Sequence, residues 1–411
     1  MSRSGTGTMR ASVAAIFALN GFLAAMWVAH IPVIAEATGV GHDELGGLLL
    51  LLGGSAFVGM QICGPLIDRW GSRPLTIAAA VLLSGVIITP VLATSALTLA
   101  GALAAFGFAN GCLDVSMNSQ AVAVERVYRR PIMSAFHGFF SVGGLLGSGV
   151  VAVTLWAEVN VVATVGVAAI GGFILTAVTA RGLAGREVGI VADGQPAASA
   201  GDARRPRWWH GVDLRRLILL AAVAFALMLA EGTAYDWSAL HVVETFGTTD
   251  AIGAIAFGAF SAAMTVSRFL IDRVSAAVGP VTVVRVGAAI GLIGMLIAVV
   301  APSSAIAVAG WTIFGIGLAG LIPQIFTAAG NLTDRAGGRS ISLVVGCGYL
   351  GMLAGPAVVG FISGRTTLGT GLLAAVVALA FAIVVAGVVA PRDASPAAVA
   401  ERGDGHATLE G

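Results

Sequence analysis

Long apolar runs separated by short polar turns make up almost the whole of this 411-residue chain. A helix needs about 20 apolar residues to cross a hydrocarbon core about 30 Å thick, and the chain contains twelve runs of that size. They cover approximately residues 11–34, 45–67, 74–94, 97–123, 133–156, 160–180, 214–238, 250–271, 281–300, 304–330, 340–363 and 368–390. The sequence therefore predicts an all-α membrane protein with twelve transmembrane helices.

Two of the divisions between runs depend on proline-containing turns. Nothing between Val286 and Thr333 is charged, and a single helix of that length would cross the bilayer more than twice. We expect the turn at residues 301–304 to split it, and residues 90–95 to divide the third and fourth spans in the same way. The composition agrees with a bilayer, because 57% of the residues are hydrophobic and only 10% are charged.

The arginines predict the orientation of the chain in the membrane. All 22 basic residues are arginines, and positive residues concentrate on the cytoplasmic side. If the N-terminus is cytoplasmic, twelve crossings place the arginines of the turns, Arg268 and Arg273 among them, on that side and only Arg365 on the other. Both termini are therefore assigned to the cytoplasm.

The longest polar interval runs from Arg181 to Arg216 and divides the chain into six spans and six. We expect an N-terminal six-helix bundle over residues 1–181 and a cytoplasmic linker over residues 182–213. A C-terminal six-helix bundle then covers residues 214–392, and a disordered cytoplasmic tail covers residues 393–411.

The two halves carry the same glycine pattern, which indicates a duplicated fold. A shift of 208 positions places the glycines of the fifth span on those of the eleventh. The matching sets are Gly138, Gly143 and Gly147 with Gly346, Gly351 and Gly355. Glycines at a four-residue step mark a helix face where backbones approach closely. The halves are therefore predicted to form two pseudo-symmetric bundles.

A charged turn after the second span is repeated after the eighth, because Leu66-Ile67-Asp68-Arg69 recurs as Leu270-Ile271-Asp272-Arg273. The first copy resembles the signature loop of the major facilitator superfamily, of form Gly-x-Leu-x-Asp-Arg-x-Gly-x-Arg. The residues that carry this resemblance are Gly64, Asp68, Arg69, Gly71 and Arg73. The runs at 114–118, 136–141 and 231–238 look like a bacterial branch of that family, distantly similar to fucose and other sugar permeases.

This resemblance implies a transport mechanism and a location. It implies the major facilitator fold, a substrate site near the bilayer midplane between the bundles, and transport by rocking of one bundle against the other. The protein is then a multi-pass protein of the bacterial cytoplasmic membrane, and we expect a monomer. By resemblance, Asp68 bridges to the other bundle when the inside is closed, with Arg126 and the N-terminus of the eleventh helix near Ser340 as candidate partners. The alternative is a solvated turn with ordinary charges.

Three polar residues of the fourth span, Asn110, Asp114 and Asn118, lie at steps of four and share one helix face. An ionisable group at bilayer depth costs at least about 2.5 to 3.5 kcal/mol on insertion scales. The corresponding positions of the second half hold the apolar residues Leu318, Ile322 and Phe326, so the polar stripe is better explained by function than by architecture. Asp114 is a candidate to carry a proton or to hold a polar substrate; a polar interhelix contact is the alternative.

Two further groups are candidates for proton coupling. Glu231 in the seventh span has Asn20 as its repeat partner, and we expect these two to face each other across the cavity. Burial favours the protonated form of a carboxylate, which a proton carrier needs. His137 in the fifth span can relay a proton, or it can be a packing histidine. Asp236, closer to the outer interface, is equally consistent with a solvated role.

The predicted sites fall into three sets. The proton-coupling candidates are Asp114, Glu231 and His137; the substrate-cavity candidates are Asn20, Trp27, Asn110, Asn118, Tyr235, Gln324 and Tyr349; the gating loops hold Gly64, Asp68, Arg69, Gly71, Arg73, Arg126, Asp272 and Arg273.

No phosphate-binding loop, metal-ligand spacing or nucleophile elbow is present in the sequence, so an enzyme, a cofactor, a metal and a nucleic-acid partner are not expected.

The sequence favours a secondary transporter that moves a small polar, sugar-like solute with protons across the lipid bilayer. An exporter of hydrophobic or drug-like compounds by proton antiport is the nearest alternative, although the fifth span has Gly147-Ser148 where such exporters usually carry Gly-Pro. A membrane sensor or scaffold that kept the fold without transport is the second alternative.

Overall fold

The structure of the protein is a computed structural model that describes residues 3–40, 42–185, 212–333 and 337–391. Twelve helical segments in this part of the chain are long and apolar enough to cross a membrane. The predicted tail, and all but a few residues of the predicted linker, lie outside the described residues.

The helices follow the predicted apolar runs closely and confirm the twelve-span fold. The first half contains α1 (Arg3–Thr38), α2 (His42–Trp70), α3 (Ser72–Val86), η1 (Pro90–Leu92), α4 (Ala96–Tyr128), α5 (Met133–Trp156), α6 (Val161–Thr179) and η2 (Ala180–Gly182). The second half contains α8 (Leu214–Phe246), α9 (Asp250–Val278), α10 (Pro280–Val300), α11 (Ser304–Leu318), α12 (Leu321–Gly330), α13 (Gly337–Ser363), α14 (Leu368–Val385) and η3 (Ala386–Val389). Both proline-containing turns divide their helices where predicted.

The tenth span is not the single continuous helix expected over residues 304–330. It breaks at Ala319 and Gly320, between α11 and α12. Pro323 has no N–H to donate to the carbonyl of Ala319 four residues earlier, and its ring crowds that carbonyl. The corresponding α4 of the first half has no proline in this region and runs unbroken.

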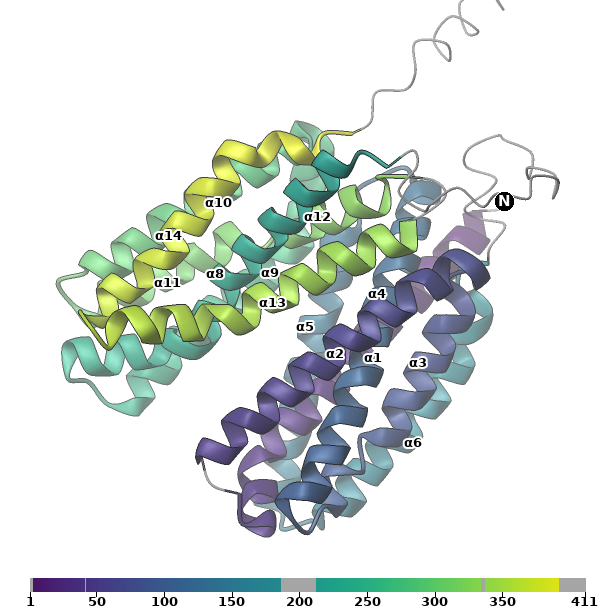
Figure 1. The fold of residues 1–411 in the computed structure, drawn as a ribbon, viewed down its shortest axis with the longest axis horizontal. Coiled ribbons are helices and arrows are strands. Elements are labelled where there is room, and N and C mark those ends of the chain that lie inside the picture. Colours follow the sequence, from purple (N-terminus) through teal and green to yellow (C-terminus); the bar gives the residue numbers. More distant parts are fainter. Residues whose placement is uncertain (1–2, 41, 186–211, 334–336, 392–411) are drawn as a thin grey trace, which may run out of the picture.

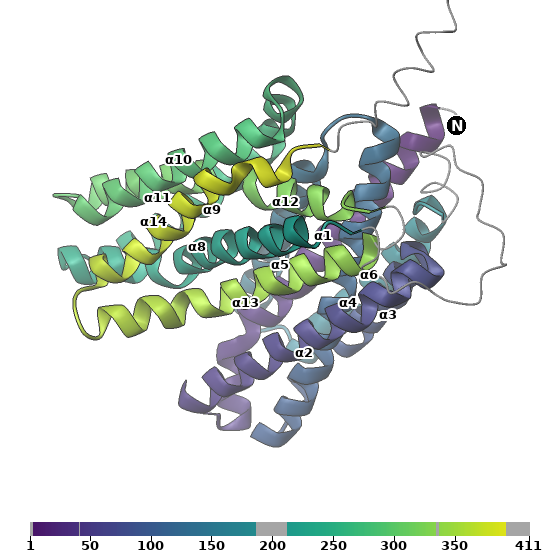
Figure 2. The same cartoon turned by 45° about the horizontal axis from the view of Figure 1, so that its top comes forward.

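The repeated glycines pack helices at equivalent places in the two halves. A Cβ added at Gly143 would lie 2.0 Å from the carbonyl oxygen of Ala18, and one added at Gly351 would lie 2.1 Å from that of Phe225. The α1–α5 pair of the first half therefore corresponds to the α8–α13 pair of the second, which run side by side in Figure 2. The glycine pattern is the packing signature that the sequence indicated.

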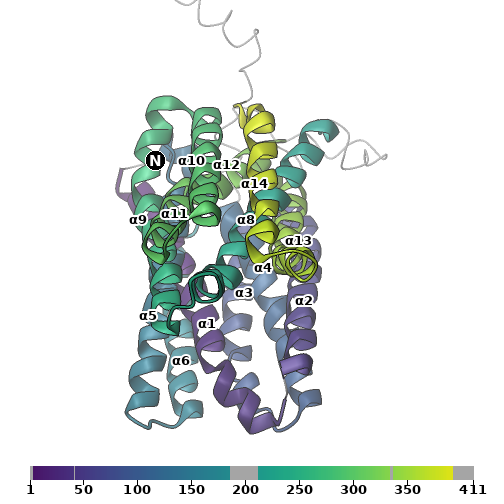
Figure 3. The same ribbon diagram turned by 90° about the vertical axis from the view of Figure 1, so that its left-hand side faces the viewer.

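The two bundles meet along two helix pairs, with α5 beside α9 and α2 beside α13 (Figure 3). Both bundles converge at the end where α1 begins and diverge toward the other end (Figure 1). We call the first end the arginine-rich face, because it carries the turns that hold Arg69, Arg73, Arg126 and Arg273. The other end is called the opposite face and carries Arg365, in the turn between α13 and α14.

The close approach at Gly143 generates a stability prediction. We expect Gly143→Ala to lower the free energy of unfolding by about 1 to 3 kcal/mol, the usual cost of overpacking a core, because its Cβ would overlap the Ala18 carbonyl. Gly149→Ala in the same helix is the matched control, since a Cβ there meets nothing within 4 Å and gains the same helix propensity. Thermal unfolding in detergent measures both; equal melting temperatures would contradict the assigned packing.

Candidate substrate and gating site

A carboxylate of α2 closes the α2–α13 contact at the arginine-rich face. Asp68 Oδ1 accepts the backbone N–H of Gly338 at 2.8 Å, in the first turn of α13. Its Oδ2 lies 3.8 Å from Nε of Arg339. The N–H groups at a helix start have no partner within the helix and carry partial positive charge, so a carboxylate is stabilised there. This is the helix terminus that the sequence suggested as a partner of Asp68.

The second copy of the turn makes the equivalent contact between α9 and α5. Asp272 Oδ1 accepts the N–H of Ser134 at 3.1 Å, and its Oδ2 accepts that of Ala135 at 2.7 Å. Both N–H groups belong to the first turn of α5. We refer to these two contacts as the Asp68 clasp and the Asp272 clasp. Each joins one bundle to the other.

Arg126 does not pair with Asp68, so this part of the expectation was wrong. Its Nη2 donates to the carbonyl of Gly330 at 2.7 Å, and its Nε donates to the side chain of Asn331. Glu125 beside it accepts the hydroxyl of Thr327 at 2.8 Å. The end of α4 therefore binds the end of α12 rather than the α2–α3 turn.

The other gating-loop candidates have local roles. Gly71 adopts a positive φ of 85°, which allows the sharp turn between α2 and α3. A Cβ at Gly64 would lie 2.5 Å from the Cβ of Ser342, so glycine permits α2 to approach α13 closely. Arg73 donates to the carbonyl of Ala180 at 3.1 Å within its own bundle. Arg69 and Arg273 are exposed.

A buried ion pair lies deeper in the molecule. Nη2 of Arg268 is 3.1 Å from Oε1 of Glu231, and both side chains are less than 10% exposed. Nη1 of Arg268 donates to the hydroxyl of Ser141 on α5 at 2.8 Å. The arginine count placed Arg268 at the cytoplasmic side, and the structure adds that it lies one turn before Asp272 with its guanidinium buried inside the protein. Glu231 therefore faces Arg268, and not Asn20 as the repeat suggested.

The polar stripe of α4 lies near this ion pair. Asn118 Nδ2 donates to the backbone carbonyl of Asp114 at 2.9 Å and to its Oδ1 at 3.4 Å. Tyr349 on α13 is close enough to interact electrostatically with both Asp114 and Glu231. Both α4 and α8 pack against α13.

His137 and Tyr235 complete this group of residues. His137 interacts electrostatically with Arg268, and its ring packs against Phe17 and Phe326 with centroids 5.3 and 5.8 Å apart. Tyr235 interacts with Glu231 and Arg268. We call the whole group the polar centre; it consists of Asp114, Asn118, His137, Ser141, Glu231, Tyr235, Arg268 and Tyr349.

The remaining cavity candidates are less closely connected. Asn20 Nδ2 donates to the sulfur of Met117 at 3.7 Å, which places it against α4. Trp27 and Gln324 are buried, and Asn110 is half-buried one turn from Asp114. The sequence missed Arg268 and Ser141. A charge within the apolar part of α9 was the available signal for Arg268, while no feature of the sequence pointed to Ser141.

Exposure changes along the helices that carry the polar centre. On α4, Asn110 is partly exposed, Asp114 is 6% exposed and Asn118 is fully buried. On α8, Tyr235 is 38% exposed and Glu231 only 7%. In both helices the more exposed residue lies nearer the opposite face. The burial of these polar side chains thus increases from the opposite face toward the polar centre.

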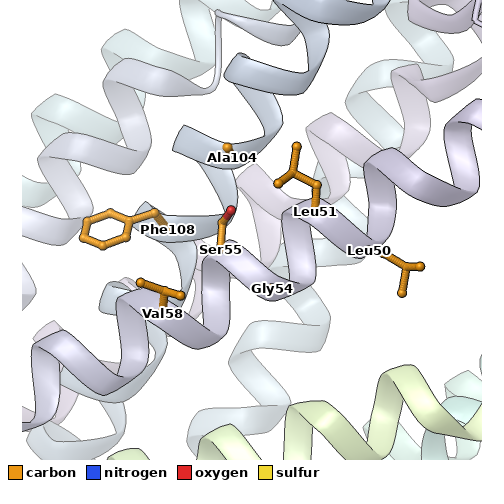
Figure 4. Close-up of a pocket in the computed structure, with 7 residues that line it drawn as sticks. All are labelled: Leu50, Leu51, Gly54, Ser55, Val58, Ala104 and Phe108. Atoms are coloured by element: carbon orange, nitrogen blue, oxygen red, sulfur yellow. The ribbon is translucent and has the colours of Figure 1, made fainter.

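A hollow of the described structure lies away from the polar centre. It has a volume of about 560 Å³ and is lined by Leu50, Leu51, Gly54, Ser55, Val58, Ala104 and Phe108 of α2 and α4 (Figure 4). Leu50 and Val58 of α2 are at least half exposed, so the hollow lies at the surface. An apolar groove on the outer surface of a bundle suits lipid chains, so it is not the candidate site for a polar solute.

Comparison with known proteins decides the family. The family model described as Major Facilitator Superfamily matches residues 12–249. An uncharacterised MFS-type transporter of Yersinia pestis is 33% identical over 352 residues, which is 86% of this chain and 88% of that protein. The chain belongs to the major facilitator superfamily. As a transporter of this family it is not an enzyme.

Solved structures of this superfamily share the fold at low sequence identity. The Escherichia coli fucose:proton symporter FucP, in the outward conformation, has a TM-score of 0.76 and 14% identity, covering 92% of this chain and 98% of that one. The proton:xylose symporter XylE has a TM-score of 0.73 and 13% identity, covering 93% of this chain and 95% of that one. These similarities establish the twelve-helix fold.

The ion pair of the polar centre generates a second stability prediction. We expect Arg268→Gln or Glu231→Gln alone to destabilise the protein by about 3 to 5 kcal/mol, because each leaves a buried charge without its partner. The double variant removes both charges, so it should be less destabilised than the sum of the single changes. Thermal unfolding of the four proteins in detergent gives the coupling energy; additive effects would show that the pair is not formed.

Proposed function

We propose that this protein is a proton-coupled secondary transporter of a small polar solute in the bacterial cytoplasmic membrane, working as a monomer. The polar centre carries the proposal. It brings two membrane-embedded carboxylates, one arginine and two tyrosines near the contact between the bundles. Ionisable groups at this depth mark substrate or proton pathways in membrane proteins.

The arginine-rich face is proposed to be cytoplasmic, since positive residues concentrate on that side. The described state is then open to the outside and closed to the inside by the two clasps. Opening to the cytoplasm requires both clasps to break, and the opposite ends of the bundles then approach each other. The shared chemistry of the clasps makes Asp68 and Asp272 pseudo-equivalent gates.

The ion pair of Glu231 supports proton coupling. Glu231 is paired with Arg268, which also contacts Ser141 across the bundle interface. Protonation of Glu231 would remove its attraction for Arg268 and so weaken a link between the bundles. The structural neighbours FucP and XylE are described as a fucose:proton and a proton:xylose symporter, which supports a polar, sugar-like solute and proton symport for this chain.

The clasps can be tested by measuring the distance between the bundles. We expect Asp68→Asn and Asp272→Asn each to shift the population toward the inward-open state, because an uncharged amide interacts more weakly with a helix N-terminus. With nitroxide labels at the exposed Val159 and Thr366, in a chain whose three cysteines are replaced by alanine, the distance across the opposite face should shorten. Electron paramagnetic resonance measures the distribution.

The control for this experiment is Asp213→Asn. Asp213 also accepts a backbone N–H at a helix start, that of Arg216 at 3.0 Å, but within its own bundle. Loss of the Asp213 carboxylate should leave the distance distribution unchanged. A distribution that responds equally to all three substitutions, or to none, would show that the clasps do not set the conformational equilibrium.

Transport itself is tested in proteoliposomes with an imposed pH gradient. We expect the wild type to accumulate members of a panel of labelled sugars, polyols and amino sugars, and Asp114→Asn and Glu231→Gln to lower this gradient-driven flux at least tenfold. Asp236→Asn is the control, since Asp236 is exposed on the same helix as Glu231. A wild-type solute flux that does not depend on the pH gradient would reject proton coupling. Selective export of hydrophobic compounds would favour the antiporter.

A further inference from the structure

Several buried polar atoms near the polar centre have no hydrogen-bond partner within the described part of the chain. On the first bundle they are Oδ2 of Asp114, the Oδ1 atoms of Asn20, Asn110 and Asn118, and Nε2 of His137. The four oxygen atoms are acceptors as assigned. A buried polar atom without a partner costs about 1 to 3 kcal/mol, so four of them in one region call for an explanation.

The orientation of two of these groups is fixed by their own contacts. Asn118 uses its Nδ2 to donate to Asp114, which leaves its Oδ1 as the free atom. When Asp114 is ionised its carboxylate only accepts, so Oδ2 is then a free acceptor whichever way the neighbouring amides point. Both side chains are more than nine-tenths buried. A ligand that meets Asp114 and Asn118 must therefore supply hydrogen-bond donors.

The charges near the wall specify the ligand further. Arg268 is the cation of the polar centre, and it is paired with Glu231. The ion pairs of the described residues, Arg268 with Glu231 and Arg339 with Asp68, leave Asp114 without a cationic partner. Asp114, Glu231 and Arg268 together carry a net charge of −1 when all are ionised. A ligand with one positive charge balances it.

We infer that the first-bundle wall formed by Asp114, Asn118 and Asn110 recognises a protonated amine that also carries hydroxyl groups, so that the transported solute is a cationic amino polyol or amino sugar. Asp114 is the counter-ion of the ammonium group, and the amide oxygens accept from the remaining donors. Tyr349, which interacts with Asp114 from α13, adds a ring whose face can contact the cation. This inference rests on the proposed transport function and names its substrate class.

The second bundle is consistent with this assignment. The repeat positions of the α4 stripe are Leu318, Ile322 and Phe326, and the last two are buried in α12. Glu231 and Arg268 neutralise each other, and the atom that the second bundle leaves without a partner in this group is a donor, Nε of Arg268. The unpartnered carboxylate and amide oxygens near the polar centre thus lie on the first bundle, and they hold the ammonium group of the solute.

The test is ligand binding by purified protein in detergent, with probes that differ only in the amine. One pair is D-glucosamine and D-glucose; the other is tris(hydroxymethyl)aminomethane and pentaerythritol, in which a fourth hydroxymethyl group replaces the amine. Thermal shift over a concentration series gives the affinities. We expect the amine of each pair to bind wild type at least tenfold more tightly than its neutral partner, and Asp114→Asn to abolish that preference.

Two further variants separate recognition from folding. Asp114→Glu keeps the charge and should keep the preference, while Asp236→Asn removes an exposed carboxylate of α8 and should leave it unchanged. Equal binding of charged and neutral probes, a preference that survives Asp114→Asn, or no binding of any probe would overturn the inference. Gradient-driven flux of a neutral solute would overturn it too while leaving the proposed function intact, whereas absence of any gradient-driven flux would reject the function itself.

Discussion

The contact of a carboxylate with the start of a helix, made twice, is the interaction on which the described state depends. Asp68 meets the first turn of α13, and Asp272 meets the first turn of α5. Each contact satisfies N–H groups that their own helix cannot satisfy. Because both clasps lie at the same face, the bundles are held together there and diverge at the other end (Figure 1). The V-shaped arrangement of the two bundles follows from these contacts.

The two halves share their packing but not their chemistry. Glycines at equivalent positions let α1 approach α5 and α8 approach α13, so the backbones form similar bundles. The polar side chains of the interior are distributed unequally: the amides and Asp114 belong to the first half, and the Glu231–Arg268 pair belongs to the second. A pseudo-symmetric scaffold thus carries an asymmetric set of buried polar groups, with unpartnered acceptors on the first half and an ion pair on the second.

Arg268 connects the polar centre with the Asp272 clasp. It pairs with Glu231 in its own bundle, donates to Ser141 of the other bundle, and lies one turn from Asp272 on α9. A change in the charge of Glu231 therefore acts on a residue that already spans the bundle interface. Coupling between the ion pair and the Asp272 clasp needs no long chain of intermediate residues, because Arg268 and Asp272 lie on the same helix.

The sequence by itself determined the twelve spans, their turns, the duplicated glycine faces and the stripe of Asn110, Asp114 and Asn118, because these depend on local hydropathy and on periodicity along one helix. It also indicated that Asp68 would meet the start of the eleventh span. The tertiary structure decided the partner of Glu231, the burial of Arg268, the pairing of Arg126 with the end of α12, and the break at Gly320. Those features depend on how helices far apart in the chain pack side by side, and an apolar run predicts that a helix is buried without specifying which neighbour it meets.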